Sequence, residues 1–255
     1  MFANYHTHTA RCHHATGEDK AYVEAAIQNG FQVLGFSDHC PWIFSDGYVS
    51  PIRMTPDELD GYVTSLTALK KEYAADITIY IGLESEYVPE MLPEQQKFLQ
   101  DYPIDYQILG EHFLYPEQRG IYTGRPTDDA AELKHYVDQV IAGMETGNYL
   151  YLAHPDLFHF IGDPACYEQE FRRLCVYLKE KQIPIEINQL GLVDHRQYPN
   201  PAFLKIAESV GNTAIIGCDA HHPSALLDTD SQQACKKLAE QYHLPLMEVL
   251  PQLSR

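Results

Sequence analysis

Histidines and carboxylates that could bind metal ions recur along this chain, beginning close to its start. His6 and His8 are separated by one residue, so in an extended segment both imidazoles lie on the same side. Two imidazoles placed in this way can bind one ion. Surface histidines would explain an isolated His-x-His pair equally well, so the hypothesis depends on partners further along the chain.

Such partners follow short hydrophobic segments that are typical of buried strands, at 31–36, 77–81, 106–109, 149–153, 184–187 and 213–218. Each partner alone could be a helix cap or a buried, hydrogen-bonded side chain. Together they would be costly to remove from water unless a cation were bound among them. The candidate metal ligands are His6, His8, His14, His39, Glu84, His112, His154, Asp219 and His221.

This set is too large for one ion, because a catalytic zinc ion uses about three protein ligands and leaves a position for water. Roughly two or three divalent ions are therefore predicted. A mixture of imidazole and carboxylate ligands favours Zn, Mn or Fe over Ca or Mg, and the ligand types do not choose among the first three metals.

The elements that must position these ligands alternate along the chain. Helical patterns at 20–29, 55–73, 94–100, 128–146, 166–181, 201–210 and 230–241 separate the predicted strands, which indicates an α/β fold with parallel strands. An open doubly wound sheet is one solution, and a TIM-like barrel of roughly seven units is the other. The polar strand ends favour the barrel, because there they converge on one face. Residues 1–255 are predicted to form a single domain, since no linker divides them.

Composition excludes several classes of protein. The formal charge of −18 argues against a nucleic-acid partner held by phosphate contacts. The sequence has no apolar run of about 18 residues, the length that would predict a membrane span, and no signal segment is recognisable. We therefore expect a cytoplasmic protein. The six cysteines form no Cys-x-x-Cys pair and are expected to be reduced. An anionic small molecule would need the local positive charge that bound cations provide.

The ordered set of motifs resembles the polymerase and histidinol phosphatase (PHP) family, and most closely its histidinol-phosphatase branch. The resemblance extends from His6 to about Gln241. The motifs that carry it are His6-Thr7-His8-Thr9, Ser37-Asp38-His39, Gly82-Leu83-Glu84, Gly110-Glu111-His112, Ala153-His154-Pro155 and Asp219-Ala220-His221.

This resemblance implies a distorted (β/α)7 TIM-like barrel, a single PHP-type domain and a trinuclear metal site. It implies that His6, His8, Glu84 and Asp219 hold the first ion. Glu84 would bridge to a second ion that His112 and His154 complete. His14, His39 and His221 would hold the third. The match to Cys-x-His-Ala selects His14 over its neighbour His13.

The resemblance also implies metal-dependent hydrolysis of a phosphate monoester, with L-histidinol phosphate as the expected substrate in histidine biosynthesis. We expect a hydroxide that bridges two ions to attack phosphorus. Histidine or aspartate near strand ends could protonate the leaving group, and arginine is the expected phosphate partner. The candidate acids are His195, His222 and Asp156. The candidate substrate-binding residues are Arg11, Arg53 and Arg196.

Three other interpretations remain open. Amidohydrolases also place His-x-His after the first barrel strand and Asp after the last, but they commonly add a carbamylated lysine near the fourth strand. No lysine stands at the corresponding strand end here, and Glu84 occupies a strand-end bridging place instead. A PHP phosphoesterase could act on another phosphomonoester or on a nucleotide. A metal-binding or sensing protein without turnover is the alternative outside enzymes.

The sequence departs from the family pattern at two positions of the expected substrate pocket. Val193 follows Gly191-Leu192, where the family often has arginine, and Glu111 precedes His112, where the family usually has a small residue.

Overall fold

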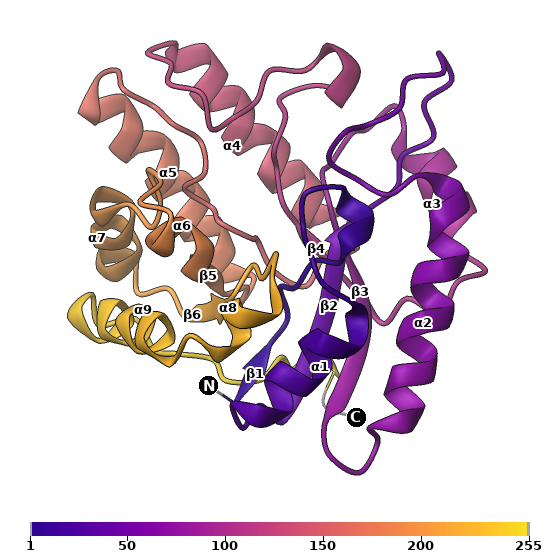
Figure 1. The fold of residues 1–255 in the computed structure, drawn as a ribbon. Helices are drawn as coiled ribbons and strands as arrows, with labels where there is room; N and C mark the ends of the chain where they lie inside the picture. Colours follow the sequence, from indigo (N-terminus) through magenta and orange to yellow (C-terminus); the bar gives the residue numbers. More distant parts are fainter. Residues whose placement is uncertain (1, 254–255) are drawn as a thin grey trace.

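The computed structural model describes residues 2–253, and strands alternate with helices along most of this length (Figure 1). The strands are β1 (Ala3–Asn4), β2 (Val33–His39), β3 (Thr78–Ser85), β4 (Tyr106–Leu109), β5 (Ile185–Asn188) and β6 (Ala214–Gly217). The α-helices are α1 (Asp19–Gln28), α2 (Leu59–Glu72), α3 (Leu92–Leu99), α4 (Ala130–Glu145), α5 (Pro164–Glu180), α6 (Gln189–Val193), α7 (Pro201–Val210), α8 (Pro223–Leu227) and α9 (Thr229–Gln241). Short 3₁₀ turns are η1 (Ala10–Cys12), η2 (Pro56–Glu58), η3 (Glu117–Arg119) and η4 (Pro251–Leu253).

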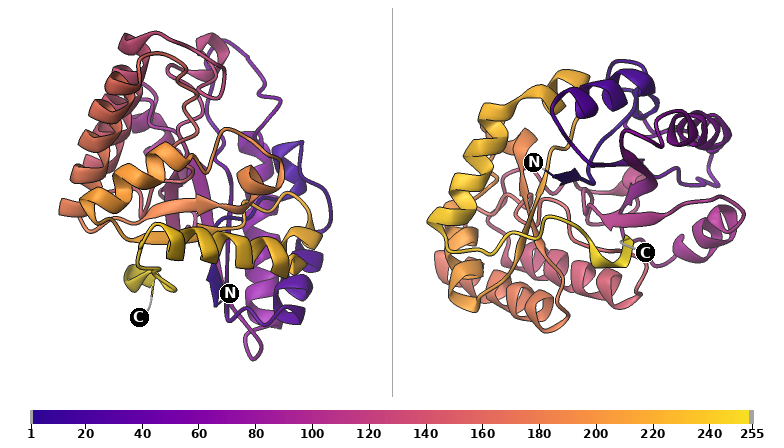
Figure 2. Two further views of the ribbon diagram at one scale, coloured as in Figure 1. Left: turned by 90° about the vertical axis from the view of Figure 1, so that its left-hand side faces the viewer. Right: turned by 90° about the horizontal axis from the view of Figure 1, so that it is seen from below.

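All of the strand pairs are parallel, in the order β1-β2-β3-β4 and β5-β6. Leu152 joins the two sheets, because it forms single bridges to Leu109 at the end of β4 and to Ile185 at the start of β5. A further bridge, from Thr7 to Ala220, connects the segments that follow the first and last strands. The strands and the segment at Leu152 thus form a distorted seven-membered ring, and helices lie around its periphery (Figure 2). The predicted TIM-like α/β fold is confirmed.

Two local predictions were wrong. Residues 149–153 were expected to form a strand, but only Leu152 makes ladder contacts on both sides. The extended stretch ends because His154 has a φ of 28°, and the Leu157 amide then donates to the His154 carbonyl in a turn. Strands β2 and β3 instead run further than expected, so that His39 and Glu84 lie within strands.

Alternation along β3 explains why Glu84 faces the interior of the barrel. Ile79, Ile81 and Leu83 belong to the buried hydrophobic cluster that also contains Leu66 of α2, so this side of the strand packs against the helices. Successive side chains in a strand point to opposite faces. Glu84 therefore lies on the inner face.

Tyr106 fills the interior of the barrel below the polar end. Its hydroxyl donates to the carbonyl of Tyr5 at 2.6 Å and to that of Phe36 at 3.1 Å. A Cβ atom on Gly82 would lie 2.4 Å from the Tyr106 ring, and one on Gly35 would lie 2.3 Å from its hydroxyl. Glycine is therefore required at both positions. The Tyr106 side chain can then link β4 by hydrogen bonds to β2 and to the segment that follows β1.

The predicted helices are present and begin within about two residues of the expected positions, if η2 and α2 are taken together, whereas the short helices α6 and α8 were not predicted. The Thr55 capping box is present, with the Glu58 carboxylate accepting from the Thr55 amide at 2.8 Å. Asp129, Asp163 and Asn200 cap α4, α5 and α7 through their side-chain oxygens. Within residues 2–253, no helix has both the length and the apolar character needed to cross a bilayer.

Candidate metal centre

The predicted ligands meet at the C-terminal ends of the strands because of strand register. In the pairing of β2 with β3, His39 is directly opposite Glu84. The bridge between Thr7 and Ala220 brings the His-x-His segment beside Asp219 on the other side of the ring. Residues far apart in sequence thus share one buried site.

The carboxylate of Glu84 lies at the centre of this site. Its side chain is 1% exposed, and a Cβ on Gly110 would lie 2.0 Å from its Oε1, so the neighbouring strand must carry glycine there. Five imidazoles surround it. The distances from a ring nitrogen to a Glu84 carboxylate oxygen are 3.5 Å for His6, 3.5 Å for His8, 3.2 Å for His39, 3.6 Å for His112 and 2.9 Å for His154.

Asp219 and the remaining imidazoles complete the cluster. The Oδ1 atom of Asp219 lies 3.1 Å from His8 Nε2, and the Nε2 atoms of His14 and His221 are 3.0 Å apart. His13, the alternative to His14, points instead to Glu58, with 3.5 Å between its Nε2 and a carboxylate oxygen. The structure thus brings together the whole set of predicted ligands.

Most of the imidazoles are held by an oxygen atom at Nδ1, which leaves Nε2 directed at the centre. The Nδ1 contacts are His6 to Glu186 at 2.8 Å, His8 to Asp38 at 3.4 Å, His14 to the Cys12 carbonyl at 2.7 Å, His112 to Glu86 at 3.0 Å and His221 to the Asp219 carbonyl at 3.0 Å. An acceptor at one ring nitrogen places the proton there and frees the other nitrogen as a metal ligand.

Several buried polar atoms of the clustered residues lack hydrogen-bond partners within the described part of the chain. They are His6 Nε2, His8 Nε2, His39 Nδ1, Glu84 Oε2, His154 Nδ1 and Asp219 Oδ1. Buried polar atoms left in this state are costly unless a bound species satisfies them. Ligand atoms of His6, His8 and Asp219 lie within 4.8 Å of one another, as do those of His14, His39 and His221.

Electrostatics indicate that the bound species is a cation. Burial lowers the pKa of His6, but the carboxylates of Glu186, Asp219 and Glu84 outweigh it and hold this pKa well above its usual range. The part of the site around His6 therefore attracts positive charge. With imidazole and carboxylate ligands and unsatisfied inward atoms, it fits a multinuclear centre of divalent ions.

The carboxylates that orient the histidines were not found by sequence reasoning. Glu186, on β5, accepts from His6 Nδ1, from the backbone amide of His154 at 2.9 Å and from Asn188 Nδ2 at 2.9 Å. A Cβ on Gly217 of β6 would lie 1.8 Å from its Oε1, so β6 leaves room for it. The inward face of the predicted strand 184–187 was the signal that could have identified Glu186.

Replacing Glu186 by glutamine is expected to weaken metal binding roughly 10- to 100-fold, because the ligand histidines lose an orienting carboxylate. Competition with a chromogenic chelator measures this affinity independently of turnover. Glu170→Gln is the matched control, since Glu170 is buried in α5 and pairs with Arg173. Equal metal affinity in the Glu186 variant and the wild-type protein would refute the orienting role.

A cavity of about 520 Å³ opens above the cluster. Arg196 lies on its wall, where its guanidinium donates to the Tyr198 hydroxyl at 3.0 Å and to Asp194 at 2.9 Å. Among the described residues no lysine lines the cavity. An amidohydrolase would be expected to have its modified lysine there. The other lining residues outside the metal cluster are Ile52, Phe113, Tyr122, Leu157 and Leu190.

Two arginines expected to bind substrate lie elsewhere. Arg53 is 1% exposed, and its guanidinium donates to Glu86, Glu117 and the Cys40 carbonyl, so it has little capacity left for a phosphate. Arg11 donates to Asp19 at 2.9 Å and lines a separate hollow. Both side chains are engaged by carboxylates and lie outside the cavity, so their predicted role in binding substrate is not supported by their positions.

The candidate acids also lie outside the cavity. His195 is exposed after α6, and His222 caps α8, where its Nδ1 accepts from the Ser224 amide at 3.1 Å. Asp156 is buried and accepts from the Asn200 amide; burial raises its pKa to about 7. None of the three lines the cavity, so their predicted contact with the leaving group is not supported.

Comparison with known proteins decides the family. The model of the PHP domain matches residues 4–190, which include the ligands from His6 to His154. The chain belongs to the PHP domain family. Asp219 and His221 lie beyond the matched segment. These two candidate metal ligands come from the loop that follows β6.

Relatives and solved structures extend this result. A protein of Deinococcus radiodurans named probable histidinol-phosphatase is 28% identical over 230 residues, covering 86% of this chain and 85% of that protein. The histidinol-phosphatase of Bacillus subtilis is 34% identical over 115 residues, 43% of each chain. The structure of histidinol phosphate phosphatase from Lactococcus lactis, complexed with zinc, L-histidinol and phosphate, has a TM-score of 0.72 at 19% identity and covers 96% of this chain and 95% of that one.

Proposed function

We propose that this PHP protein hydrolyses a small phosphate monoester, with L-histidinol phosphate as the substrate, in the cytoplasm as part of histidine biosynthesis. The observation that carries the proposal is the buried cluster of unsatisfied imidazole and carboxylate atoms at the base of a cavity with an arginine on its wall. The names of the Deinococcus and Bacillus relatives, and the ligands of the Lactococcus structure, support the choice of substrate.

In this proposal His6, His8, Glu84 and Asp219 hold one ion, Glu84, His112 and His154 a second, and His14, His39 and His221 a third. When bound, such ions neutralise charge on the phosphate oxygens and activate water for attack on phosphorus. The protein supplies their positions, since Glu186, Asp38 and Glu86 fix the rings of His6, His8 and His112.

The cavity itself favours a small substrate. Its volume of about 520 Å³ is within the usual range for small-molecule sites, roughly 300–1,000 Å³. The formal charge of −18 opposes the approach of a long nucleic acid. Phe113, Tyr122 and Leu157 provide apolar surface for the part of the substrate beyond the phosphate.

Arg196 is the phosphate-binding arginine in this proposal, because it lines the metal-centre cavity and the other two candidates, Arg11 and Arg53, do not. Replacing it by alanine is expected to raise KM roughly 10- to 100-fold, the loss of a charged hydrogen bond worth about 1.5–3 kcal/mol. Steady-state kinetics with L-histidinol phosphate measure the change. The exposed Arg119 is a suitable control position. Unchanged KM and kcat would show that another residue binds the phosphate.

Phosphate release from a panel of phosphomonoesters tests the proposed substrate. Metal-loaded protein is expected to give a kcat/KM for L-histidinol phosphate well above those for nucleoside monophosphates and sugar phosphates. Equal, slow release from all compounds would favour a general PHP phosphoesterase. No release from any of them would favour a metal-binding protein without turnover.

A further inference from the structure

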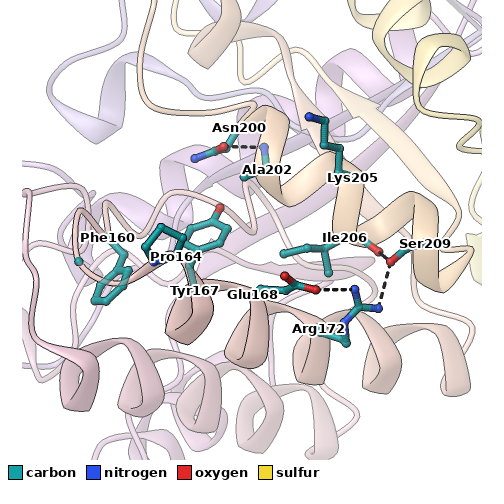
Figure 3. A pocket seen from close by; sticks show the side chains of 11 residues that line it. Phe160, Pro164, Tyr167, Glu168, Arg172, Asn200, Ala202, Lys205, Ile206 and Ser209 are labelled. Carbon is teal, nitrogen blue, oxygen red and sulfur yellow. Dashed lines mark hydrogen bonds and ion pairs between the residues drawn. The ribbon is translucent and has the colours of Figure 1, made fainter.

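Charged side chains form ion pairs on the walls of two cavities. In a cavity of about 440 Å³ between α5 and α7, Arg172 donates to Glu168 at 2.9 Å and to Ser209 at 3.0 Å (Figure 3). That cavity shares no lining residue with the metal-centre cavity. In the metal-centre cavity, Arg196 pairs with Asp194 at 2.9 Å. A substrate bound at the metal ligands would meet the second pair and not the first.

The loop that carries this second pair is held by its own backbone. Asp194 follows the last residue of α6, and its amide donates to the Leu190 carbonyl at 2.9 Å. The Arg196 amide donates to the Gly191 carbonyl at 2.9 Å, and His195 between them has a φ of 53°. The chain therefore turns sharply after α6, and both charged residues line the cavity.

The contacts of Arg196 set the order of the charges relative to the metal centre. Its Nη1 donates to the Tyr198 hydroxyl at 3.0 Å, and the Tyr198 ring lies 5.7 Å, centroid to centroid, from the ring of the candidate ligand His154. Its Nη2 and Nε atoms donate to Asp194 Oδ2 at 2.9 Å and 3.2 Å. Along these contacts from His154, the positive group therefore comes first and the negative group second.

One carboxylate oxygen of Asp194 remains available to a ligand. Both hydrogen bonds from Arg196 go to Oδ2, and Oδ1 accepts none from residues 2–253. An ionised carboxylate can accept hydrogen bonds at both oxygens. The Asp194 side chain is 43% exposed, so a molecule that enters the cavity can reach it. Oδ1 can thus bind a cationic group while Oδ2 keeps its contact with Arg196.

We propose that Asp194 binds the ammonium group of the substrate and makes the site selective for phosphate esters of vicinal amino alcohols. This inference rests on the proposed function, in which the phosphate lies at the metal centre and contacts Arg196. In L-histidinol phosphate, the carbon that bears the ammonium group is bonded directly to the carbon that bears the phosphate ester. Arg196 and Asp194, which are in contact with each other, therefore match the phosphate and the ammonium in the same order.

Phosphate release from two esters tests the inference. One is L-histidinol phosphate, and the other is the imidazolylpropyl phosphate that lacks only its amino group. In metal-loaded wild-type protein, kcat/KM is expected to be roughly tenfold higher for L-histidinol phosphate, which corresponds to one charged hydrogen bond at the lower end of its range because Asp194 is partly exposed. In Asp194→Asn the ratio of the two kcat/KM values should fall to about one.

The ratio separates recognition of the amine from a purely structural role. If Asp194 served only to hold Arg196, Asp194→Asn would lower kcat/KM equally for both esters and leave the ratio at its wild-type value, and this result would overturn the inference. Asp138→Asn is the matched control, because Asp138 is equally exposed, pairs with Arg173 at 2.8 Å and does not line the cavity.

The same assay distinguishes failure of the inference from failure of the proposed function. Equal kcat/KM values for the two esters in the wild-type protein would refute selection by Asp194 and leave the phosphatase activity standing. No phosphate release from either ester would contradict the proposed function, and the inference with it.

Discussion

The Glu84→Gln variant is expected to release phosphate with a kcat lower by roughly 10³-fold, because metal ions contribute several kcal/mol to such reactions and about 1.4 kcal/mol corresponds to a factor of ten. The amide has nearly the shape of the carboxylate but lacks its charge. Five imidazoles lie within 3.6 Å of this carboxylate, so its charge is central to the whole cluster. Metal content should fall together with kcat.

Elemental analysis and single-turnover phosphate release on the same sample measure both effects. Glu72→Gln provides a control, since Glu72 is exposed and pairs with Lys20 at 2.7 Å, away from the metal cluster. A normal circular dichroism spectrum would show that the variant is folded. Wild-type metal content with a wild-type rate would mean that Glu84 does not hold the metals.

The Arg53→Met variant is expected to lose about 3–5 kcal/mol of unfolding free energy, because removing one partner leaves buried charges uncompensated. Arg53 lies between Glu86 at 2.9 Å and Glu117 at 2.6 Å, and all three side chains are at most 5% exposed. In a protein of this size the change lowers the melting temperature by roughly 10 °C. Urea unfolding measures the free energy directly.

The loss of unfolding free energy in the Arg53→Met variant should depend on pH. Burial raises the pKa of Glu86, but Arg53 and then His112 outweigh it and hold this pKa below its usual range. The stabilisation is therefore present above the ordinary carboxyl pKa of about 4.3 and is lost as pH falls below it. The difference in unfolding free energy between the Arg53→Met variant and the wild-type protein should be largest above about pH 5 and smaller at acid pH.

Arg125→Met is the control for Arg53, because the Arg125 pair with Glu132 has a similar distance, 2.6 Å, at a half-exposed position. Exposed pairs contribute about 0–1 kcal/mol, so little change is expected. If both variants lost the same small free energy, the buried network would have no special role in stability.

The barrel, and the residues that meet in the candidate metal cluster, could be predicted from the sequence because both depend on local patterns. Strand ends can be recognised from hydrophobic runs, and parallel strands bring those ends to one face. His39 and Glu84 were identified even though they lie within strands, since the residue types at the ends of the runs were enough. The segment at Leu152 was misjudged because its pairing ends at the backbone turn of His154, which residue types do not encode.

Contacts between distant residues could not be predicted in this way. Arg53 was expected to bind substrate, but its partners Glu86 and Glu117 come from other parts of the chain and bury it. Glu186 was overlooked because its partner, His6, is 180 residues away in sequence. A charged residue in a loop is compatible with either role until the fold places its partners.

Phosphate release from L-histidinol phosphate, measured before chelation, after chelation and after restoring zinc or manganese, tests the central claim most directly. A multinuclear metal phosphatase should lose activity as metal is removed and regain it as divalent ions are returned. Undiminished activity in the metal-free protein, or no activity in the fully reloaded protein, would contradict the account.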